Sequence, residues 1–287
     1  KTETPPRGFE KIGENENYNI YRNNYSMPLG VVIDQTISIE DFEKLSIRQK
    51  DVALLNCIVS DDIQESNLTQ YQNELNVESE EITLEEMYLE GITLAEKNDM
   101  YEIQCESEDF NRICLQTKDM QWTEDNEYIV SFKIYSPTEN SIFIQWNEGD
   151  VWKQKIISVT EGMNNVNFTI DYKNTDTLCM YFQKGTYQIG NLHYESSSED
   201  AIDEVYQSGI SEKSFLQMDT YENNLITGTI ETEKDSFLLF MIPFDKNWEL
   251  YVDGKEAQLQ QVDYGFMGSR IAAGNHVIKL DYVPDSN

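Results

Sequence analysis

The spacing of hydrophobic residues changes along the chain, and each change predicts a different kind of element. In residues 8–35, short apolar groups alternate with turn residues, which predicts two strands joined by a polar loop. Residues 38–59 follow with near-helical spacing of Phe42, Leu45 and Val52, which predicts a helical segment. From about Met100 the apolar period becomes two, so strands are expected over the next hundred residues.

Turn signals divide this alternating region into eight short strands, which is typical of a β-sandwich or jelly roll. The strand candidates are Tyr101–Cys105, Ile113–Gln116, Tyr128–Tyr135, Ser141–Trp146, Lys153–Val159, Asn165–Ile170, Leu178–Phe182 and Gln188–Glu195. Ser196–Gly209 then reads as a short linker helix, with Ser198 as its N-cap and Gly209 at its end.

A second β module follows the linker helix. Its strand candidates are Phe215–Tyr221, Leu225–Thr232, Ser236–Ile242, Trp248–Val252, Ala257–Val262, Phe266–Ile271 and His276–Tyr282. Asp253-Gly254 is the clearest hairpin signal, because this dipeptide supplies the positive φ angles of a type I′ turn.

The pattern therefore predicts a mainly β fold of tandem β-sandwich or jelly-roll modules with a few short helices. We expect five segments: N-terminal strands and a helical part that pack with the C-terminal module (1–60), an acidic connector (61–99), a β-sandwich like a carbohydrate-binding module (100–195), a linker helix (196–210) and a C-terminal β module (211–287).

Charge narrows the range of partners. The chain has 21 basic and 53 acidic residues among 287, a formal net charge of −32. Such a surface repels phosphate backbones and anionic lipids, which excludes nucleic acid as a partner. Residues 61–108 alone hold 15 acidic side chains and one basic one, Lys97, so a solvated connector is expected there.

The cysteine and histidine residues give no indication of a metal or cofactor site. The four cysteines form no CxxC pair, and His193 and His276 are the only histidines, so no metal site or cofactor is expected. Free, buried thiols are the favoured interpretation of the cysteines, and a disulfide between Cys105 and Cys114 is the alternative.

A candidate ligand site lies in the middle β module. Trp146 and Trp152 flank a polar loop that contains Asn147 and Asp150. Aromatic rings beside amide and acidic groups suit a sugar, whose apolar ring face stacks while its hydroxyls form hydrogen bonds. The alternative places one tryptophan in the core and the other at its rim.

Both ends of the chain contain distinctive short motifs. They are Tyr21-Arg22-Asn23, Met27-Pro28-Leu29-Gly30, Ile242-Pro243, Trp248, Val252-Asp253-Gly254, Phe266-Met267-Gly268, Ala273-Gly274-Asn275-His276 and Asp281-Tyr282-Val283-Pro284. Together these motifs resemble the bacterial YfhO-like membrane proteins, and the sequence departs from that family at Phe244 and Asn247, where Tyr and Gly are commoner. We expect Tyr21, Pro28, Pro243, Trp248, Asp253, Gly254, Gly274 and His276 to be structural parts of this family motif.

The resemblance implies a polytopic GT-C-type glycosyltransferase that moves sugars from polyprenyl-phosphate donors to envelope polymers such as lipoteichoic acid. It implies that this chain is an extracytoplasmic domain of an integral membrane protein, joined to the membrane by segments outside the sequence. No apolar run here approaches the ~20 residues needed to span a bilayer. The catalytic carboxylates would lie in that missing membrane part, so no catalytic residue is assigned to this chain.

Two functions remain open. The chain binds or orients the acceptor polymer for such an enzyme, or it is a cell-surface carbohydrate-binding module or adhesin with no enzymatic role. Asp245 and Asp253 could be read as a glycosidase pair, but their positions in turns favour structural roles.

Overall fold

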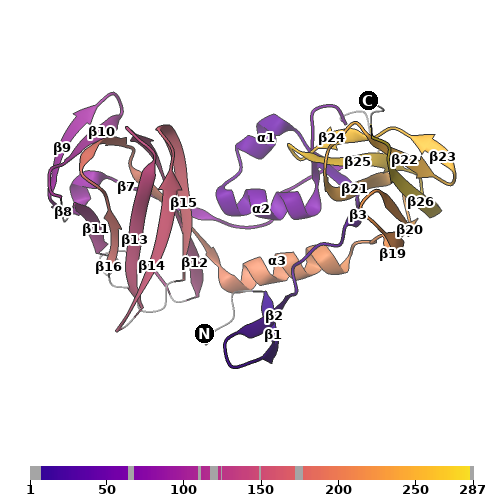
Figure 1. The fold of residues 1–287 in the computed structure, drawn as a ribbon, viewed down its shortest axis with the longest axis horizontal. Coiled ribbons are helices and arrows are strands. Elements are labelled where there is room, and N and C mark those ends of the chain that lie inside the picture. Colours follow the sequence, from indigo (N-terminus) through magenta and orange to yellow (C-terminus); the bar gives the residue numbers. More distant parts are fainter. Residues whose placement is uncertain are drawn as a thin grey trace. The chain divides into compact units, whose positions relative to one another are not determined.

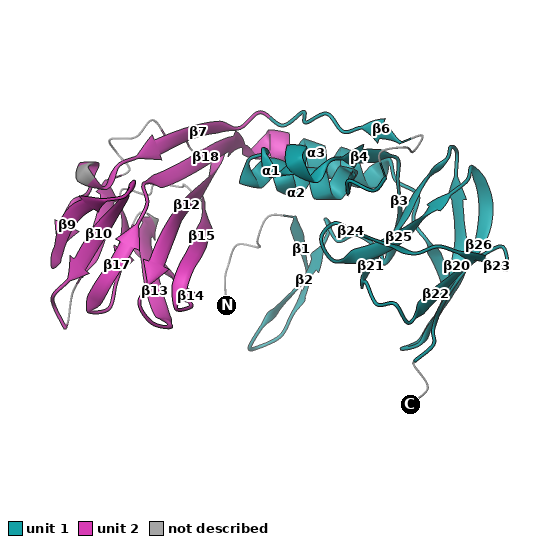
Figure 2. Cartoon of the chain, turned by 90° about the horizontal axis from the view of Figure 1, so that it is seen from above, with its two compact units in different colours: residues 1–75, 203–287 teal, residues 76–202 magenta. Residues whose placement is uncertain are grey.

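The chain forms two compact units in the computed structural model (Figures 1 and 2). The structure describes residues 8–63, 68–108, 111–116, 122–123, 125–148, 150–171 and 177–284. Unit 1 contains residues 1–75 and 203–287, and unit 2 contains residues 76–202. The chain passes from unit 2 back into unit 1 within helix α3 (Glu199–Ser211).

Unit 2 is a β-sandwich of two antiparallel sheets. One sheet has five strands in the order β14 (Val151–Val159), β13 (Asn140–Glu148), β16 (Thr177–Tyr181), β11 (Arg112–Gln116) and β8 (Tyr88–Glu90). The other has the order β7 (Glu78–Ile82), β18 (Leu192–Ser198), β12 (Asn126–Ser136), β17 (Gly185–Ile189), β10 (Met100–Cys105) and β9 (Ile92–Lys97), with β15 (Gly162–Asp171) also paired to β12.

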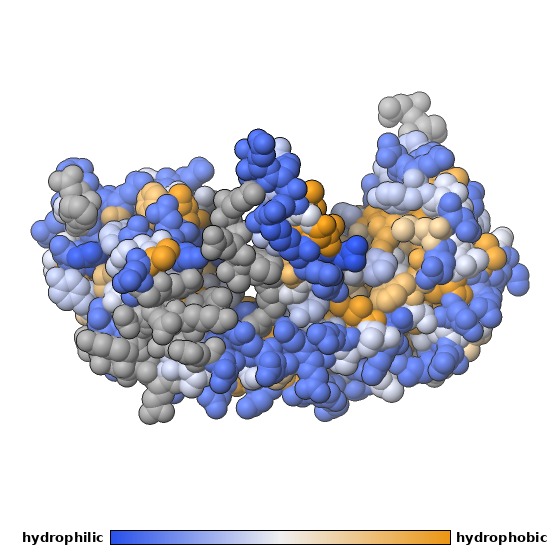
Figure 3. Space-filling view, turned by 90° about the horizontal axis from the view of Figure 1, so that it is seen from below, coloured by the Kyte–Doolittle hydropathy of each residue, from blue (hydrophilic) through white to orange (hydrophobic). Residues whose placement is uncertain are grey.

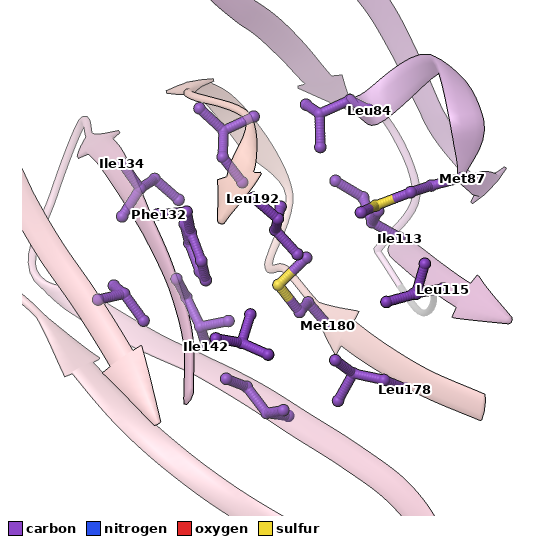
Figure 4. Packing of buried hydrophobic residues seen from close by; sticks show 14 of the residues in the cluster. Leu84, Met87, Ile113, Leu115, Phe132, Ile134, Ile142, Leu178, Met180 and Leu192 are labelled. Carbon is purple, nitrogen blue, oxygen red and sulfur yellow. The ribbon is translucent and has the colours of Figure 1, made fainter. Parts of the chain in front are cut away.

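Alternate side chains of both sheets meet in one hydrophobic core (Figure 4). Phe132 and Ile134 of β12 lie on one side, and Ile142 of β13 and Met180 of β16 lie on the other. The short 3₁₀ helix η1 (Leu84–Glu86) adds Leu84, which is fully buried. Period-two alternation therefore produces the sandwich, and the predicted mainly β fold class is confirmed.

The acidic segment 61–99 differs from the connector expected of it. Residues 78–97 include strands β7, β8 and β9, which pair with β18, β11 and β10. Most carboxylates of these strands are exposed to solvent, while Ile82 and Met87 are buried in the core. Because so many residues of this segment are acidic, the sequence pattern did not identify these strands. Residues 64–67 of the expected connector lie outside the described residues.

Unit 1 contains a second sandwich, together with an isolated hairpin of β1 (Phe9–Glu14) and β2 (Asn19–Asn23). Its first sheet has the order β19 (Gln217–Tyr221), β20 (Leu225–Thr232), β26 (Gly274–Tyr282), β22 (Trp248–Val252) and β23 (Lys255–Ala257). The second has the order β24 (Gln260–Val262), β25 (Phe266–Ile271), β21 (Ser236–Pro243) and β3 (Gly30–Ile33).

Strand β21 is covered on both faces, which explains its continuous apolar run. Leu238 and Phe240 pack in the core between the two sheets. Phe237 and Leu239 pack in a separate cluster on the opposite face, with Ile58. Because β3 pairs with β21, the N-terminal segment is part of the same unit as the C-terminal module.

Unit 1 also contains a small parallel sheet and two short helices. The strand order of this sheet is β5 (Ile58–Val59), β4 (Gln35–Ile37) and β6 (Thr69–Gln70), and helices α1 (Ile39–Glu43) and α2 (Ile47–Asn56) connect β4 to β5 along the chain. Ser38 and Ser46 cap these helices by accepting backbone N–H bonds from Asp41 and Gln49.

Helix α3 ends later than expected. It continues through Gly209 to Ser211, so the prediction that Gly209 terminates the helix is wrong. A Cβ atom at Gly209 would lie 2.7 Å from Oδ1 of Asn56 on α2. The glycine therefore permits close packing of the two helices rather than ending one of them.

Candidate functional site: the outer face of the five-stranded sheet

The five-stranded sheet of unit 2 has one face in the core and one directed outward. Inward positions are fixed by buried Ile113, Ile144 and Met180, so their neighbours in sequence point outward. The outward positions are Trp152, Gln154, Ile156, Ser158, Ser141, Phe143, Gln145, Asn147, Thr177, Cys179, Tyr181, Arg112, Cys114, Gln116, Tyr88 and Glu90. We call this set the aromatic face.

Strand register aligns these side chains in rows across the sheet. The first row is Trp152, Asn147, then Thr177 and Gln116. The second row is Gln154, Gln145, Cys179, Cys114 and Tyr88. The third row is Ile156, Phe143, Tyr181, Arg112 and Glu90. Each row therefore combines aromatic or apolar groups with amide or charged ones.

Large apolar groups of this face are open to solvent. Trp152 is 59% exposed, Tyr88 58% and Ile156 55%, and Phe143 is also exposed. Between them, Nε2 of Gln145 donates a hydrogen bond to Oε1 of Gln154 at 3.4 Å. Exposed aromatic side chains gathered on one face of a folded unit are characteristic of an interaction surface.

The aromatic face is electrically neutral although the chain carries −32. Its only charged residues are Arg112 and Glu90, and they form an ion pair in which Nε of Arg112 donates to Oε2 of Glu90 at 2.6 Å. The guanidinium also approaches the Tyr181 ring at 6.0 Å from its centroid. By contrast, outward positions of the other sheet include Glu81 and Glu195.

A disulfide crosses the middle of the aromatic face. Cys114 on β11 is bonded to Cys179 on β16, directly opposite, and both are buried beneath their neighbours. Cys57 and Cys105 are free and buried. Burial raises the pKa of the Cys105 thiol to about 12, so it is not reactive. The prediction of four free thiols, and its Cys105–Cys114 alternative, are both wrong because the pairing depends on strand register.

The four residues of the predicted glycan site are separated by the pleat of the sheet. Trp152 and Asn147 form a directly opposed pair on the aromatic face. Trp146 lies on the opposite face and packs against the core, while Asp150 is exposed in the turn after β13. Oδ1 of Asn147 accepts a hydrogen bond from the Thr177 backbone at 2.9 Å, which fixes the start of β16.

The sequence interpretation missed most of this face. Phe143, Tyr181, Tyr88 and Arg112 come from four strands that are distant in sequence. The alternation of β13 was visible in the sequence and indicates that Phe143 and Asn147 share a face. Nothing local identifies β8 as the neighbour of β11.

Two parts of the family motif meet at one hairpin in unit 1. Asp253 and Gly254 adopt φ angles of 52° and 75°, which confirms the predicted type I′ turn. Oδ1 of Asp253 accepts from the Val277 backbone N–H at 2.9 Å, and Oδ2 lies 2.8 Å from Nδ1 of His276. Nε2 of His276 lies 3.0 Å from the Ala272 carbonyl.

These contacts fasten the β22–β23 turn to strand β26. The hydrogen bond from the Val277 backbone, and then that from His276, hold the pKa of Asp253 below its ordinary value. Gly274 has a φ of 136°, a conformation that L side chains rarely adopt. The geometry here holds the strands together.

The remaining motif residues occupy strand ends and core edges. The Trp248 ring packs edge-on against Tyr282 at 5.1 Å between centroids. Pro243 is exposed at the end of β21. Pro28 precedes β3. The Tyr21 hydroxyl accepts a hydrogen bond from Nδ2 of Asn19 at 3.1 Å in the β1–β2 hairpin.

No carboxylate pair suited to glycoside chemistry arises from Asp245 and Asp253. They lie at opposite ends of β22, five residues long, so at ~3.3 Å per residue they are well beyond the ~5–9.5 Å that such pairs require. Oδ1 of Asp245 accepts from the Asn247 backbone, which makes it a turn former. Within the described residues, no cluster of three or more His, Cys, Asp or Glu side chains could hold a metal ion.

The chain belongs to the family described as bacterial membrane protein YfhO, whose model matches residues 1–286. It is 24% identical over 283 residues to the uncharacterized protein YfhO of Bacillus subtilis (strain 168), which covers 97% of this chain. The chain spans about a third, 31%, of the length of that curated relative. Among the helices that the structure describes, none is long and apolar enough to cross a bilayer.

Similar solved structures are carbohydrate-binding modules. The E78R mutant of a family 29 module is 13% identical, with a TM-score of 0.34 over 42% of this chain and 92% of that one. The C-terminal family 6 module of LamC from Zobellia galactanivorans is 12% identical, with a TM-score of 0.34 over 41% of this chain and 98% of that one. Similarities this weak say nothing about function.

Proposed function

We propose that this chain is an extracytoplasmic, glycan-binding part of a membrane-associated glycosyltransferase-like protein, and that the aromatic face holds the acceptor polymer. The observation that carries the proposal is the neutral surface on which Trp152, Phe143 and Tyr88 are exposed beside amide side chains. Transfer of the sugar itself is assigned to parts of the protein outside this sequence.

The chemistry of the face matches that of a sugar chain. The C–H faces of a sugar ring pack on aromatic rings, and its hydroxyls pair with amides that both donate and accept hydrogen bonds. Gln145, Gln154 and Gln116 supply such amides across three strands. Because the aromatic face carries one ion pair and no net charge, an anionic envelope polymer meets less repulsion here than elsewhere on the chain.

The disulfide supports an extracytoplasmic position. Disulfides form and persist in oxidising compartments and are rare where cytosolic reductants act. Cys114 and Cys179 lie opposite each other on adjacent strands of the aromatic face, so the bond links the two strands at the centre of the proposed binding surface. Labelling of intact cells with a membrane-impermeant reagent, at a cysteine introduced in place of exposed Ser158, tests the sidedness. Labelling without lysis supports the proposal, and labelling only after lysis contradicts it.

A binding titration tests the proposed surface. Purified chain is titrated with neutral oligosaccharides and with lipoteichoic acid, and tryptophan fluorescence is recorded for the native chain and for Trp152→Ala. We expect the variant to lose affinity about fivefold or more, since stacking on an exposed aromatic ring contributes ~1 kcal/mol or more. The matched control is Tyr135→Ala, which removes an exposed ring from the other sheet. Equal affinity in all three proteins, or no binding at all, would refute the proposal.

A cell-surface carbohydrate-binding role without enzymatic function would use the same aromatic face. Membership in the YfhO family favours the glycosyltransferase-like role. A bacterium whose own gene carries Trp152→Ala separates the two. Loss of polymer glycosylation with normal protein levels supports acceptor binding, whereas unchanged glycosylation together with loss of cell-surface glycan binding supports the second role.

A further inference from the structure

Unit 1 contains a polar groove that is separate from the aromatic face. It consists of two cavities of about 340 and 370 Å³. Helices α2 and α3 and strands β4 and β6 supply the walls of the first cavity, and the β20–β21 turn continues the second. Gln35, Asn56, Gly209 and Glu212 line both, so the cavities adjoin along α3. Volumes of this size accommodate small ligands.

Three glutamine side chains line the groove. The side chains of Gln35, Gln70 and Gln72 line it and form no hydrogen bond within the described residues. Each amide offers two N–H donors and a carbonyl acceptor. Three such groups on one cavity form a surface that matches a ligand rich in hydroxyl groups.

Lys213 adds an ammonium group to the same groove. Among the residues that the structure describes, its Nζ donates one hydrogen bond, to Oδ1 of Asn56 at 3.2 Å. An ammonium has three N–H donors, so two more acceptors can be satisfied by a ligand. Lys213 is half-buried, and this burial lowers the pKa of its ammonium group. Gly209 makes this arrangement possible, because a side chain there would collide with Asn56.

The charge of the lining decides between neutral and anionic ligands. Four carboxylates line the two cavities, from Asp34, Glu74, Glu212 and Glu233, against the two ammonium groups of Lys213 and Lys234. Asp34 and Lys234 form an ion pair and cancel each other. The remaining excess of negative charge opposes an anion, while carboxylates accept hydrogen bonds from ligand hydroxyls.

We propose that this groove is a second binding site, which takes a neutral, hydroxyl-rich small molecule of the size of one or two sugar units. The amides of Gln35, Gln70 and Gln72 pair with its hydroxyls, and Lys213 donates to its oxygens. The groove lies entirely within unit 1, so this site does not depend on the aromatic face of unit 2.

The test is a titration of the isotope-labelled 287-residue chain with glucose, N-acetylglucosamine and glucuronate, followed by NMR at backbone amides. Neutral sugars are expected to shift signals of Gln70, Ser208 and Lys213, and glucuronate to bind more weakly. The double variant Gln70→Ala/Gln72→Ala should lower affinity about tenfold, since hydrogen bonds from two amides to the ligand are removed. Both side chains are exposed, so folding is preserved.

The matched control is Gln104→Ala/Gln258→Ala, which removes two exposed amides outside the groove and should leave affinity unchanged. Tighter binding of glucuronate than of glucose would overturn the assignment of a neutral ligand. Absence of groove shifts with every probe would overturn the site itself. Trp152→Ala should leave groove binding intact, so failure of either site is distinguishable from failure of the other.

Discussion

A single buried carboxylate in unit 1 is expected to make stability depend on pH. Asp263 lies in the turn between β24 and β25, 8% exposed, and its Oδ1 accepts the Val59 backbone N–H at 2.7 Å. Burial raises its pKa from 3.8 to about 6, and the hydrogen bond from Val59 opposes this shift. Replacement by asparagine keeps an oxygen that accepts the Val59 N–H and removes the charge.

The magnitude follows from the difference between folded and unfolded pKa values. The folded state holds the Asp263 proton more tightly, so its contribution to stability is complete below the unfolded pKa of 3.8 and is lost as the pH rises through about 6. The difference corresponds to about 3 kcal/mol at pH 8. Asp263→Asn should therefore raise the free energy of unfolding by up to ~3 kcal/mol at pH 8 and by less than ~1 kcal/mol at pH 4.

Urea denaturation of the native and variant chains between pH 4 and pH 8 measures this difference. The matched control is Asp219→Asn, which removes an exposed carboxylate from the same highly negative chain. It should give a small change that does not follow the same pH profile. A gain for Asp263→Asn that is the same at both pH values, or a loss at pH 8, would refute the assignment of a desolvated carboxylate.

Further predictions concern packing and cross-links. Replacing Cys114 and Cys179 together by alanine should lower the free energy of unfolding in urea by about 4 kcal/mol, because the bond closes a loop of sequence separation 65; an unchanged midpoint would contradict the bond. Gly268→Ala should destabilise by ~1–3 kcal/mol in the same assay, because a Cβ would lie 2.3 Å from the Phe237 ring. His276→Ala should raise the pKa of Asp253 only part of the way to its ordinary value in an NMR titration, because the Val277 N–H remains; no rise would exclude the His276 contact.

Local signals predicted the local features of this protein. The Asp253-Gly254 turn depends on two residues whose positive φ angles are intrinsic to their type, and the structure has it as expected. Period-two alternation likewise predicted strands such as Ser141–Trp146, which lies within β13 (Asn140–Glu148). Helix α3 shows where local signals fail. Glycine often ends a helix, but Gly209 lies within α3 and leaves space for the side chain of Asn56 on α2.

Features that depend on pairing between distant strands could not be predicted. The aromatic face joins Tyr88, Arg112, Phe143 and Tyr181 through the register of four strands, and the Cys114–Cys179 bond depends on the same register. A shift of one residue in any strand would send its aromatic group into the core. The candidate site was therefore only partly visible from sequence, through the Trp152 hairpin.

The central claim is that the aromatic face of unit 2 binds a glycan. A crystal structure of the chain with the oligosaccharide that binds most tightly tests it directly. The account predicts a sugar ring stacked on Trp152 and ligand hydroxyls paired with Gln145 or Gln154. A ligand bound to the other sheet of unit 2, or bound only in the groove of unit 1, would contradict it.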